Sequence, residues 1–183
     1  MPDVLLSRQA PYSIEAEQAV LGSMLIEPKC IPGVIERLKP DDFYVEADRL
    51  VYDTIHQMFL NGRAIDPVTV LDEMKALGYK DAANRDFFLQ LIDTTPTAAN
   101  VEEYTDIIRS KSMLRELQTV SSEIIDLTRS EEEDADTVAD LAEQKIYAVR
   151  QGREVQGFTS VNDAIQDVYA HLDELAANPG KLP

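Results

Sequence analysis

The sequence predicts an all-α protein with a compact helical head, an antiparallel helical hairpin and a separate linker helix. Apolar residues recur at intervals of three and four along most of the chain, which is the period of an amphipathic helix. Pro, Gly and Asn interrupt this pattern where helices are expected to begin or end. We therefore divide the chain into a head (residues 11–99), a hairpin (100–150), a flexible linker (151–159) and a linker helix (160–178).

The first half of the head is expected to contain one core helix and one short helix. The core helix follows Ser13, whose hydroxyl can act as an N-cap. Its apolar residues lie at helical spacing: Val20, Leu21, Met24 and Leu25. Pro28 and Pro32 then interrupt the pattern, and a short helical segment ends before Pro40.

The second half of the head is also expected to be helical. Residues 48–60 have a helical apolar pattern that ends at an Asn-Gly pair, a usual left-handed stop. Asp66 followed by Pro67 has the order of an N-cap and a first helical residue. The apolar segment 87–92 is short enough to be helix or strand, and its neighbours favour a helix.

The hairpin is predicted by two helical patterns joined by a polar turn. No Gly or Pro occurs from Asn100 to about Thr128, which predicts a single helix of about 40 Å. The segment 130–136 is polar, and a second helical pattern then continues to Arg150. Because the longer arm is only partly covered by the shorter one, its stripe is expected to continue into a second molecule or the head. We assign hairpin pairing and partner contact to this stripe: Leu114, Leu117, Val120, Ile124 and Leu127.

The linker helix carries an apolar stripe with no obvious partner in its own chain. Residues 151–157 contain two glycines and mostly polar side chains, which favours a flexible linker. The stripe that follows is spaced 4, 3, 4, 3: Val161, Ile165, Val168, Leu172 and Leu175. A helix of about 18 residues is marginal alone in water, so we expect this stripe to dock on another subunit or domain. Folding back onto its own hairpin is the alternative.

The charge balance limits the partners. Lys and Arg number 17 against 34 Asp and Glu, a net charge of −17, so the chain should repel a phosphate backbone and bind no nucleic acid directly. No apolar run approaches the roughly 18 residues of a membrane span, and the first residues do not resemble a signal peptide, so we expect a cytoplasmic protein with no membrane contact. Between Glu123 and Glu143, nine acidic residues and one basic residue form either a solvated face or a site for a basic partner.

We find no catalytic constellation in the sequence and expect no cofactor in this chain. The seven glycines match neither a P-loop nor a dinucleotide-binding turn. Asp53 and His56 share a helix face and could contribute to a metal site, but a surface pair is the simpler interpretation. The single cysteine, Cys30, can form neither an intramolecular disulfide nor a thiolate zinc cluster.

Five sequence blocks occur in an order typical of a known family. They are PYSIEAEQAVLG at 11–22, DFY at 42–44, IDPVTV at 65–70, TPTAANV at 95–101 and AEQKIY at 142–147. Together they resemble the bacterial replicative DNA helicases of the DnaB family. The chain departs from that pattern at Asp48, where the family usually has His, and in a shorter segment from Gly78 to Arg85.

The resemblance implies that this chain is the N-terminal domain, hairpin and linker helix of a hexameric helicase, truncated before the ATPase domain that binds ATP and Mg²⁺. It also implies that the hairpins pair, that the heads form a trimer of dimers, and that primase and a helicase loader dock on this collar. The linker helix would lie against a neighbouring motor domain. Phe88 stands where the family often has an aromatic residue, and is the candidate primase contact.

Two other interpretations remain open from the sequence. A free-standing adaptor or loader could use the same helical domain to bind a helicase. A small metal-binding or hydrolytic domain could be built around Asp53, His56 and their acidic neighbours.

Overall fold

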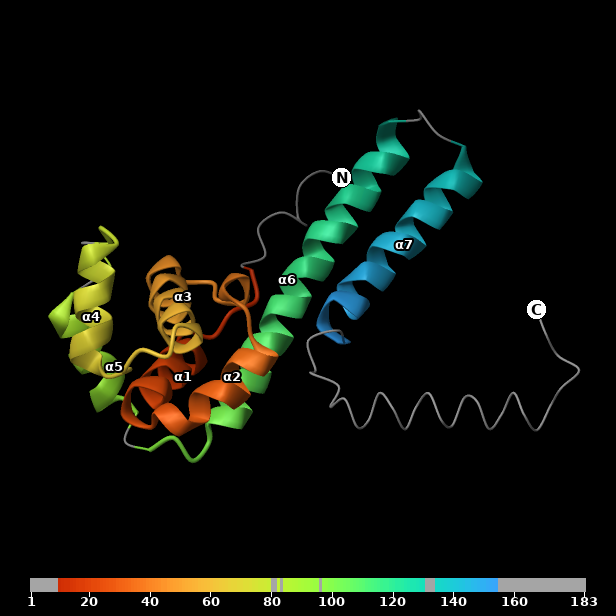
Figure 1. The fold of residues 1–183 in the computed structure, drawn as a ribbon. Helices are drawn as coiled ribbons and strands as arrows, with labels where there is room; N and C mark the ends of the chain where they lie inside the picture. The colour runs from red at the N-terminus through yellow and green to blue at the C-terminus, as the bar shows by residue number, and fades with distance from the viewer. Residues whose placement is uncertain (1–9, 80–81, 83, 96, 131–133, 155–183) are drawn as a thin grey trace, which may run out of the picture.

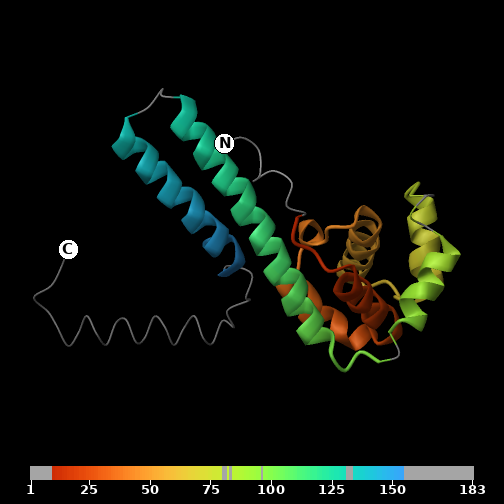
Figure 2. The same ribbon diagram turned by 180° about the vertical axis from the view of Figure 1, so that it is seen from behind.

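All the secondary structure that the structure describes is helical, which confirms the predicted all-α class. The computed structural model describes residues 10–79, 82, 84–95, 97–130 and 134–154. The elements are α1 (Ile14–Ile26), the 3₁₀ helix η1 (Pro28–Cys30), α2 (Ile31–Arg37), the 3₁₀ helix η2 (Pro40–Asp42), α3 (Glu46–Leu60), α4 (Pro67–Ala76), α5 (Arg85–Asp93), α6 (Val101–Ser130) and α7 (Ala135–Glu154). Helices α1 and α2 pack against the first half of α6, α3 packs on α1, and α4 and α5 lie on the side of the head away from α6 (Figures 1 and 2). Helix α7 runs back beside the second half of α6.

The helix boundaries follow the capping signals of the sequence. The Ser13 side chain accepts a hydrogen bond from the backbone N–H of Ala16 at 3.3 Å, as an N-cap does. Asp66 accepts hydrogen bonds from the backbone N–H groups of the residues two and three positions later, directly before Pro67. Gly62 and Gly78 have φ angles of 63° and 86°, the left-handed conformation that ends a helix. The predicted start of α1, the predicted end of α3 and both predicted boundaries of α4 are confirmed, whereas α3 begins at Glu46, two residues before its predicted start.

The ambiguous apolar segment 87–92 belongs to helix α5. Asn84 accepts a hydrogen bond from the backbone N–H of Asp86 at 2.9 Å and caps this helix. Phe88 and Leu91, three residues apart, are both buried against the rest of the head. The three-residue spacing of these two buried side chains is that of a helix, in which both face the core.

One hydrophobic core holds the head together and includes the start of α6. Val101 and Ile108 of α6 belong to the same buried cluster as the apolar residues of α1, α3, α4 and α5. The core thus extends past residue 99, where the sequence placed the end of the head. The reason is that the first turns of the long helix cover α1, against which α6 packs extensively.

Polar contacts also fasten α6 to the head. The Arg115 guanidinium donates hydrogen bonds to the backbone carbonyls of Pro11 and Asp42. It also lies 5.7 Å from the centroid of the Tyr44 ring, which stacks on Tyr12 with a centroid separation of 4.5 Å. A cation above an aromatic ring is attracted by the ring's quadrupole. Arg115 therefore connects the N-terminal segment and the loop before α3 to the middle of α6.

Helix α7 extends further than the sequence suggested. It continues to Glu154, four residues into the segment expected to be a flexible linker, and includes Gly152. A single glycine inside a helix costs only about 1 kcal/mol relative to Ala, which the surrounding helix-forming residues can offset. The expected linker helix lies outside the described residues, as do its five docking residues: Val161, Ile165, Val168, Leu172 and Leu175.

Helices α1 and α5 approach each other so closely that Gly22 has no room for a side chain. A Cβ atom there would lie 2.3 Å from the hydroxyl oxygen of Thr95 and 2.4 Å from the backbone oxygen of Leu91. The backbone oxygen cannot rotate away as a side chain can. The contact between these two helices therefore requires glycine at this position.

We predict that Gly22→Ala lowers the free energy of unfolding by about 1–3 kcal/mol, because α1 and α5 must separate to admit the methyl group. Gly33→Ala is the matched control, since a Cβ at this helical glycine meets no heavy atom within 4 Å. The control should leave stability unchanged or raise it by up to about 1 kcal/mol. Urea denaturation of both variants measures this, and equal stabilities would contradict the prediction.

Candidate protein-interaction site

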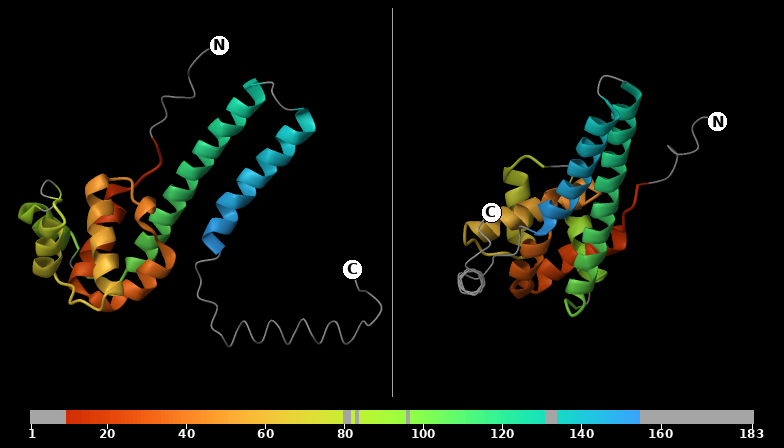
Figure 3. Two further views of the ribbon diagram at one scale, coloured as in Figure 1. Left: turned by 45° about the horizontal axis from the view of Figure 1, so that its top comes forward. Right: turned by 90° about the vertical axis from the view of Figure 1, so that its right-hand side faces the viewer.

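The hairpin formed by α6 and α7 buries its apolar residues incompletely. The two arms lie side by side and extend away from the head (Figure 3). Among the described α7 residues whose exposure is defined, Val149 alone is buried, with 8% of its surface exposed. The other apolar residues spaced toward α6 remain half-buried: Val138, Leu141 and Ala142. Two helices alone therefore leave this layer partly open to solvent.

The predicted partner stripe divides between two faces of α6. Val120, Ile124 and Leu127 are half-buried, and Val120 lies opposite Val149 of α7 across a groove. Leu117 is also half-buried, whereas Leu114 is 45% exposed. At about 100° per residue, Leu114 points roughly 80–140° away from the other three along the helix. The structure therefore places one part of the predicted set in the hairpin and the other part on its outside.

A second row of apolar residues lies on the outside of α6. Ile107, Leu114 and Ile125 are 40%, 45% and 44% exposed, and their spacings of seven and eleven residues place them on one helix face. We call these three residues the outer stripe. Two further apolar residues of α7, Ile146 and Tyr147, are 46% and 57% exposed. The hairpin thus presents large apolar side chains to its surroundings on both arms.

Ile125 was not among the residues predicted from the sequence to contact a partner. Steps of three and four along α6 lead from Leu117 through Val120 to Ile124, which is the face toward α7. A signal for the outer stripe was present, because Ile107 and Ile125 are separated by 18 residues, or about five full turns. The two residues on that face between Leu114 and Ile125, Gln118 and Ser121, are polar and interrupt the apolar periodicity.

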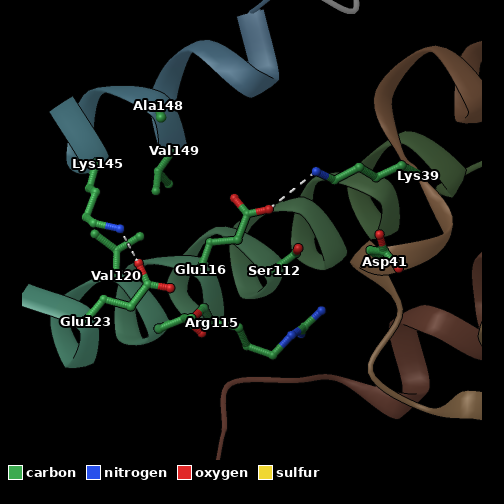
Figure 4. A pocket seen from close by; sticks show the side chains of 11 residues that line it. Lys39, Asp41, Ser112, Arg115, Glu116, Val120, Glu123, Lys145, Ala148 and Val149 are labelled. Atoms are coloured by element: carbon green, nitrogen blue, oxygen red, sulfur yellow. Dashed lines mark hydrogen bonds and ion pairs between the residues drawn. The ribbon is translucent and has the colours of Figure 1, made fainter. Parts of the chain in front are cut away.

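A groove of about 530 Å³ lies where the hairpin meets the head. Figure 4 shows residues from three places around it: the loop and 3₁₀ helix before α3, the middle of α6, and the end of α7. Its walls combine aliphatic side chains such as Val120 and Val149 with charged ones. The groove brings together segments that are about 100 residues apart in the sequence.

Four of the charged side chains that line this groove form ion pairs across its walls. Lys39 Nζ lies 3.4 Å from Glu116 Oε1, which connects the head to α6. Lys145 Nζ lies 2.7 Å from Glu123 Oε2, which connects α7 to α6. Alternating charges of both signs suit a polar protein surface better than a phosphate group. Both pairs are partly exposed, so each contributes at most about 1 kcal/mol.

Asp134 determines where α7 begins after the acidic turn. Its carboxylate accepts hydrogen bonds from the backbone N–H and the hydroxyl of Thr137, at 2.9 and 3.0 Å. The backbone hydrogen bond is the main cause that lowers the pKa of Asp134, and the hydroxyl adds to it. This N-cap keeps a negative charge at the start of α7.

Phe88, the candidate primase contact, is not at the surface. It is 2% exposed and packs in the head core, with its ring edge-on to that of Phe87. Its side chain is therefore not accessible to a partner in this structure, although the adjacent Leu89 is 47% exposed. The sequence did not distinguish these neighbours, because either could face outward on a short amphipathic helix.

The described residues show neither a metal site nor a membrane span. No group of three or more His, Cys, Asp or Glu side chains in that part of the chain could hold a metal ion, and this includes the surroundings of Asp53 and His56. Among the same residues, none of the helices combines the length and apolar character that crossing a bilayer requires.

Known proteins are similar to this chain in sequence. Residues 9–110 match the family model described as the DnaB-like helicase N terminal domain. Replicative DNA helicase DnaB of Mycobacterium leprae is 35% identical over 98% of this chain and 30% of its own length. The same-named protein of Geobacillus stearothermophilus is 32% identical over 100% of this chain and 40% of its own length.

Solved structures agree. The crystal structure of the N-terminal domain of DnaB helicase from Mycobacterium tuberculosis has a TM-score of 0.70 and 37% identity, and the match covers 76% of this chain and 99% of that one. The N-terminal domain of DnaB helicase from Helicobacter pylori, described with its interactions with primase, shares the fold with a TM-score of 0.55 and 22% identity, over 63% of this chain and 90% of that one.

The chain matches only part of each full-length relative, but the family model matches most of the described head. The chain spans about a third of the length of the curated relatives described above. The family model covers more than half of the chain, from the residues before α1 to the end of the first third of α6. The chain therefore belongs to the family of DnaB-like helicase N-terminal domains.

Proposed function

We propose that this chain is the collar domain of a replicative helicase, in which the hairpins of two copies pair. The outer stripe of Ile107, Leu114 and Ile125 carries this proposal. Three large apolar side chains on one face of a 30-residue helix, each at least 40% exposed, form a surface that a second helical layer would bury.

The half-buried interior of the hairpin supports the same proposal. Val120, Ile124 and Leu127 retain contact with solvent although they lie near α7. A second hairpin would complete the burial of these residues, as neighbouring helices do in a four-helix bundle. In a two-fold symmetric pair each residue contributes twice, so a short stripe provides a sizeable apolar interface.

The collar also serves as a docking surface for primase and a helicase loader in this proposal. The groove between the head and the hairpin offers paired charges and aliphatic walls drawn from three segments. The similarity to the Helicobacter pylori domain, whose description includes interactions with primase, supports primase as the partner. The acidic hairpin turn would attract a basic partner surface.

In the complete protein, the linker helix 160–178 would connect the collar to the ATPase ring by docking on the neighbouring motor domain. The ATP and Mg²⁺ chemistry would belong to that motor domain. The collar would then set the geometry of the ring without itself hydrolysing ATP or binding DNA.

The hairpin proposal predicts that Leu114→Asp disrupts self-association. Burying one leucine contributes about 1.5–3 kcal/mol, and two-fold symmetry doubles the loss, so the dimer dissociation constant should rise by at least about 100-fold. Light scattering of the 183-residue chain over a range of concentrations measures this. The exposed position of Leu114 leaves the fold itself intact.

Val68→Asp is the matched control for this experiment. Val68 is 75% exposed on α4, so the same charge is introduced on the head, away from the hairpin. This variant should associate as the original chain does. A Leu114→Asp protein that keeps the original dissociation constant would exclude pairing through the outer stripe.

We predict that primase binding weakens several-fold when ionic strength rises from about 0.05 to about 0.5 M, because salt screens the acidic hairpin. Replacing exposed hairpin carboxylates, as in Asp126→Asn with Asp140→Asn, should reduce both the affinity and its salt dependence. Asp72→Asn, an exposed substitution on α4, provides the control. An affinity that does not respond to salt in titration calorimetry would remove the acidic hairpin from the interface.

For the linker helix, we predict that Ile165→Asp reduces hexamer assembly of the complete helicase, because it places a charge in the apolar docking stripe. Ala170→Asp introduces the same charge five residues later, on the side of the expected helix opposite the apolar stripe, and should assemble normally. Sedimentation velocity distinguishes hexamers from smaller species. Full assembly of the Ile165→Asp protein would contradict docking between subunits.

A further inference from the structure

Two carboxyl groups lie side by side inside the head. Glu17 of α1 is 1% exposed, and Asp48 of α3 is 0% exposed. Glu17 accepts a hydrogen bond from the backbone N–H of Val45, three residues before Asp48 at the start of α3, and this contact brings the two carboxyl groups close together. Two negative charges so close together in the interior of a protein would repel strongly, because little water is present to screen them.

Glu17 has backbone partners for its negative charge. Its Oε1 accepts a hydrogen bond from the backbone N–H of Tyr44 at 3.0 Å, and its Oε2 accepts one from Val45 at 3.1 Å. Val45 is the N-cap residue of α3. Glu17 therefore holds the start of α3 from a neighbouring helix, and these two donors stabilise its ionised form.

This arrangement deprives Asp48 of its usual partner. Asp48 is the third residue of α3, a position whose side chain in a capping box accepts the backbone N–H of the N-cap residue. Here the Val45 N–H donates to Glu17 instead. Neither carboxyl oxygen of Asp48 receives a hydrogen bond from any donor in the described part of the chain. An ionised Asp48 would thus be buried and unsatisfied.

We propose that Glu17 and Asp48 form a proton-binding site: Asp48 takes up a proton from solvent in the folded head and donates it in a hydrogen bond to the ionised Glu17. A single proton on Asp48 removes the repulsion between the two carboxylates, and it also allows Asp48 to form a hydrogen bond with Glu17 as the acceptor. The proposal assigns the head a built-in response to pH near neutrality, and it does not depend on the proposed function.

The surrounding charges agree with this assignment. Burial, followed by the charge of Glu17, raises the pKa of Asp48 to about 7. Burial raises the pKa of Glu17, and the backbone N–H groups of Tyr44 and Val45, followed by Arg115 on α6, oppose that rise by favouring its ionised form. Arg49, on the same helix as Asp48, lies within 4.0 Å of exposed carboxylates of Asp41 and Glu46. The proton therefore belongs on Asp48.

The sign of the pH effect follows from this proton. Between about pH 4 and about pH 7 the folded chain retains the Asp48 proton while the unfolded chain has lost it. The folded state thus binds more protons, so its stability falls as pH rises through this range. Above about pH 7 both states have lost the proton and this contribution levels off.

Asp48→Asn tests the proposal in the 183-residue chain. The amide has nearly the same shape, carries no charge and can donate to Glu17 at every pH. Urea denaturation from about pH 5 to about pH 8.5 gives the unfolding equilibrium constant of each protein. The ratio of the original constant to that of the variant should rise about tenfold per pH unit up to about pH 7 and then level off. The variant should be the more stable protein at the alkaline end.

Glu46→Gln is the matched control, since it removes an exposed carboxylate from the first turn of the same helix. Its pH curve should run parallel to that of the original chain. Parallel curves for Asp48→Asn as well would overturn the proposal. Should that variant fail to fold, the carboxyl ¹³C resonance of Asp48 in the original chain provides the test: titration near neutrality supports the site, and titration at about pH 4 excludes it.

Discussion

The continuity of α6 is the constraint on which the molecule's organisation depends. This helix runs for 30 residues, or about 45 Å, without glycine or proline. Its first half presents Val101, Thr105, Ile108 and Ser112 to the head core, at spacings of four, three and four. Its second half forms one arm of the hairpin. Because one rigid rod belongs to both parts, the direction of the hairpin is fixed by the packing of the head.

The attachments of α6 are concentrated on one side of the rod and leave the opposite side free for partners. Ion pairs join it to the head from Arg37 to Asp106 and from Lys39 to Glu116. Arg115 adds hydrogen bonds to two backbone carbonyls of the head. The outer stripe lies on a different face, so a partner could cover it without displacing any contact that holds the head to the hairpin.

Local signals in the sequence predicted most of the fold, but contacts between distant segments could not be read from it. The caps at Ser13 and Asp66 and the left-handed glycines act within one turn of the chain, which is why their positions were correct. The outer stripe was only partly predicted, because the apolar residues of α6 lie on two faces of the helix and the sequence pattern was interpreted as a single stripe. Phe88 is buried by its neighbours in the fold, a fact that its own segment does not encode.

A few acidic side chains are buried in the head, and most of them have backbone hydrogen-bond donors that stabilise their charge. Among the described residues three acidic side chains are buried: Glu17, Asp42 and Asp48. Asp42 accepts the backbone N–H of Lys39 at 2.9 Å, and Glu17 accepts two backbone N–H groups, which offset the cost of burying their charges. Asp48 lacks such a donor because Glu17 has taken it. The same contact that anchors α1 to α3 therefore makes Asp48 the residue whose charge the fold cannot accommodate.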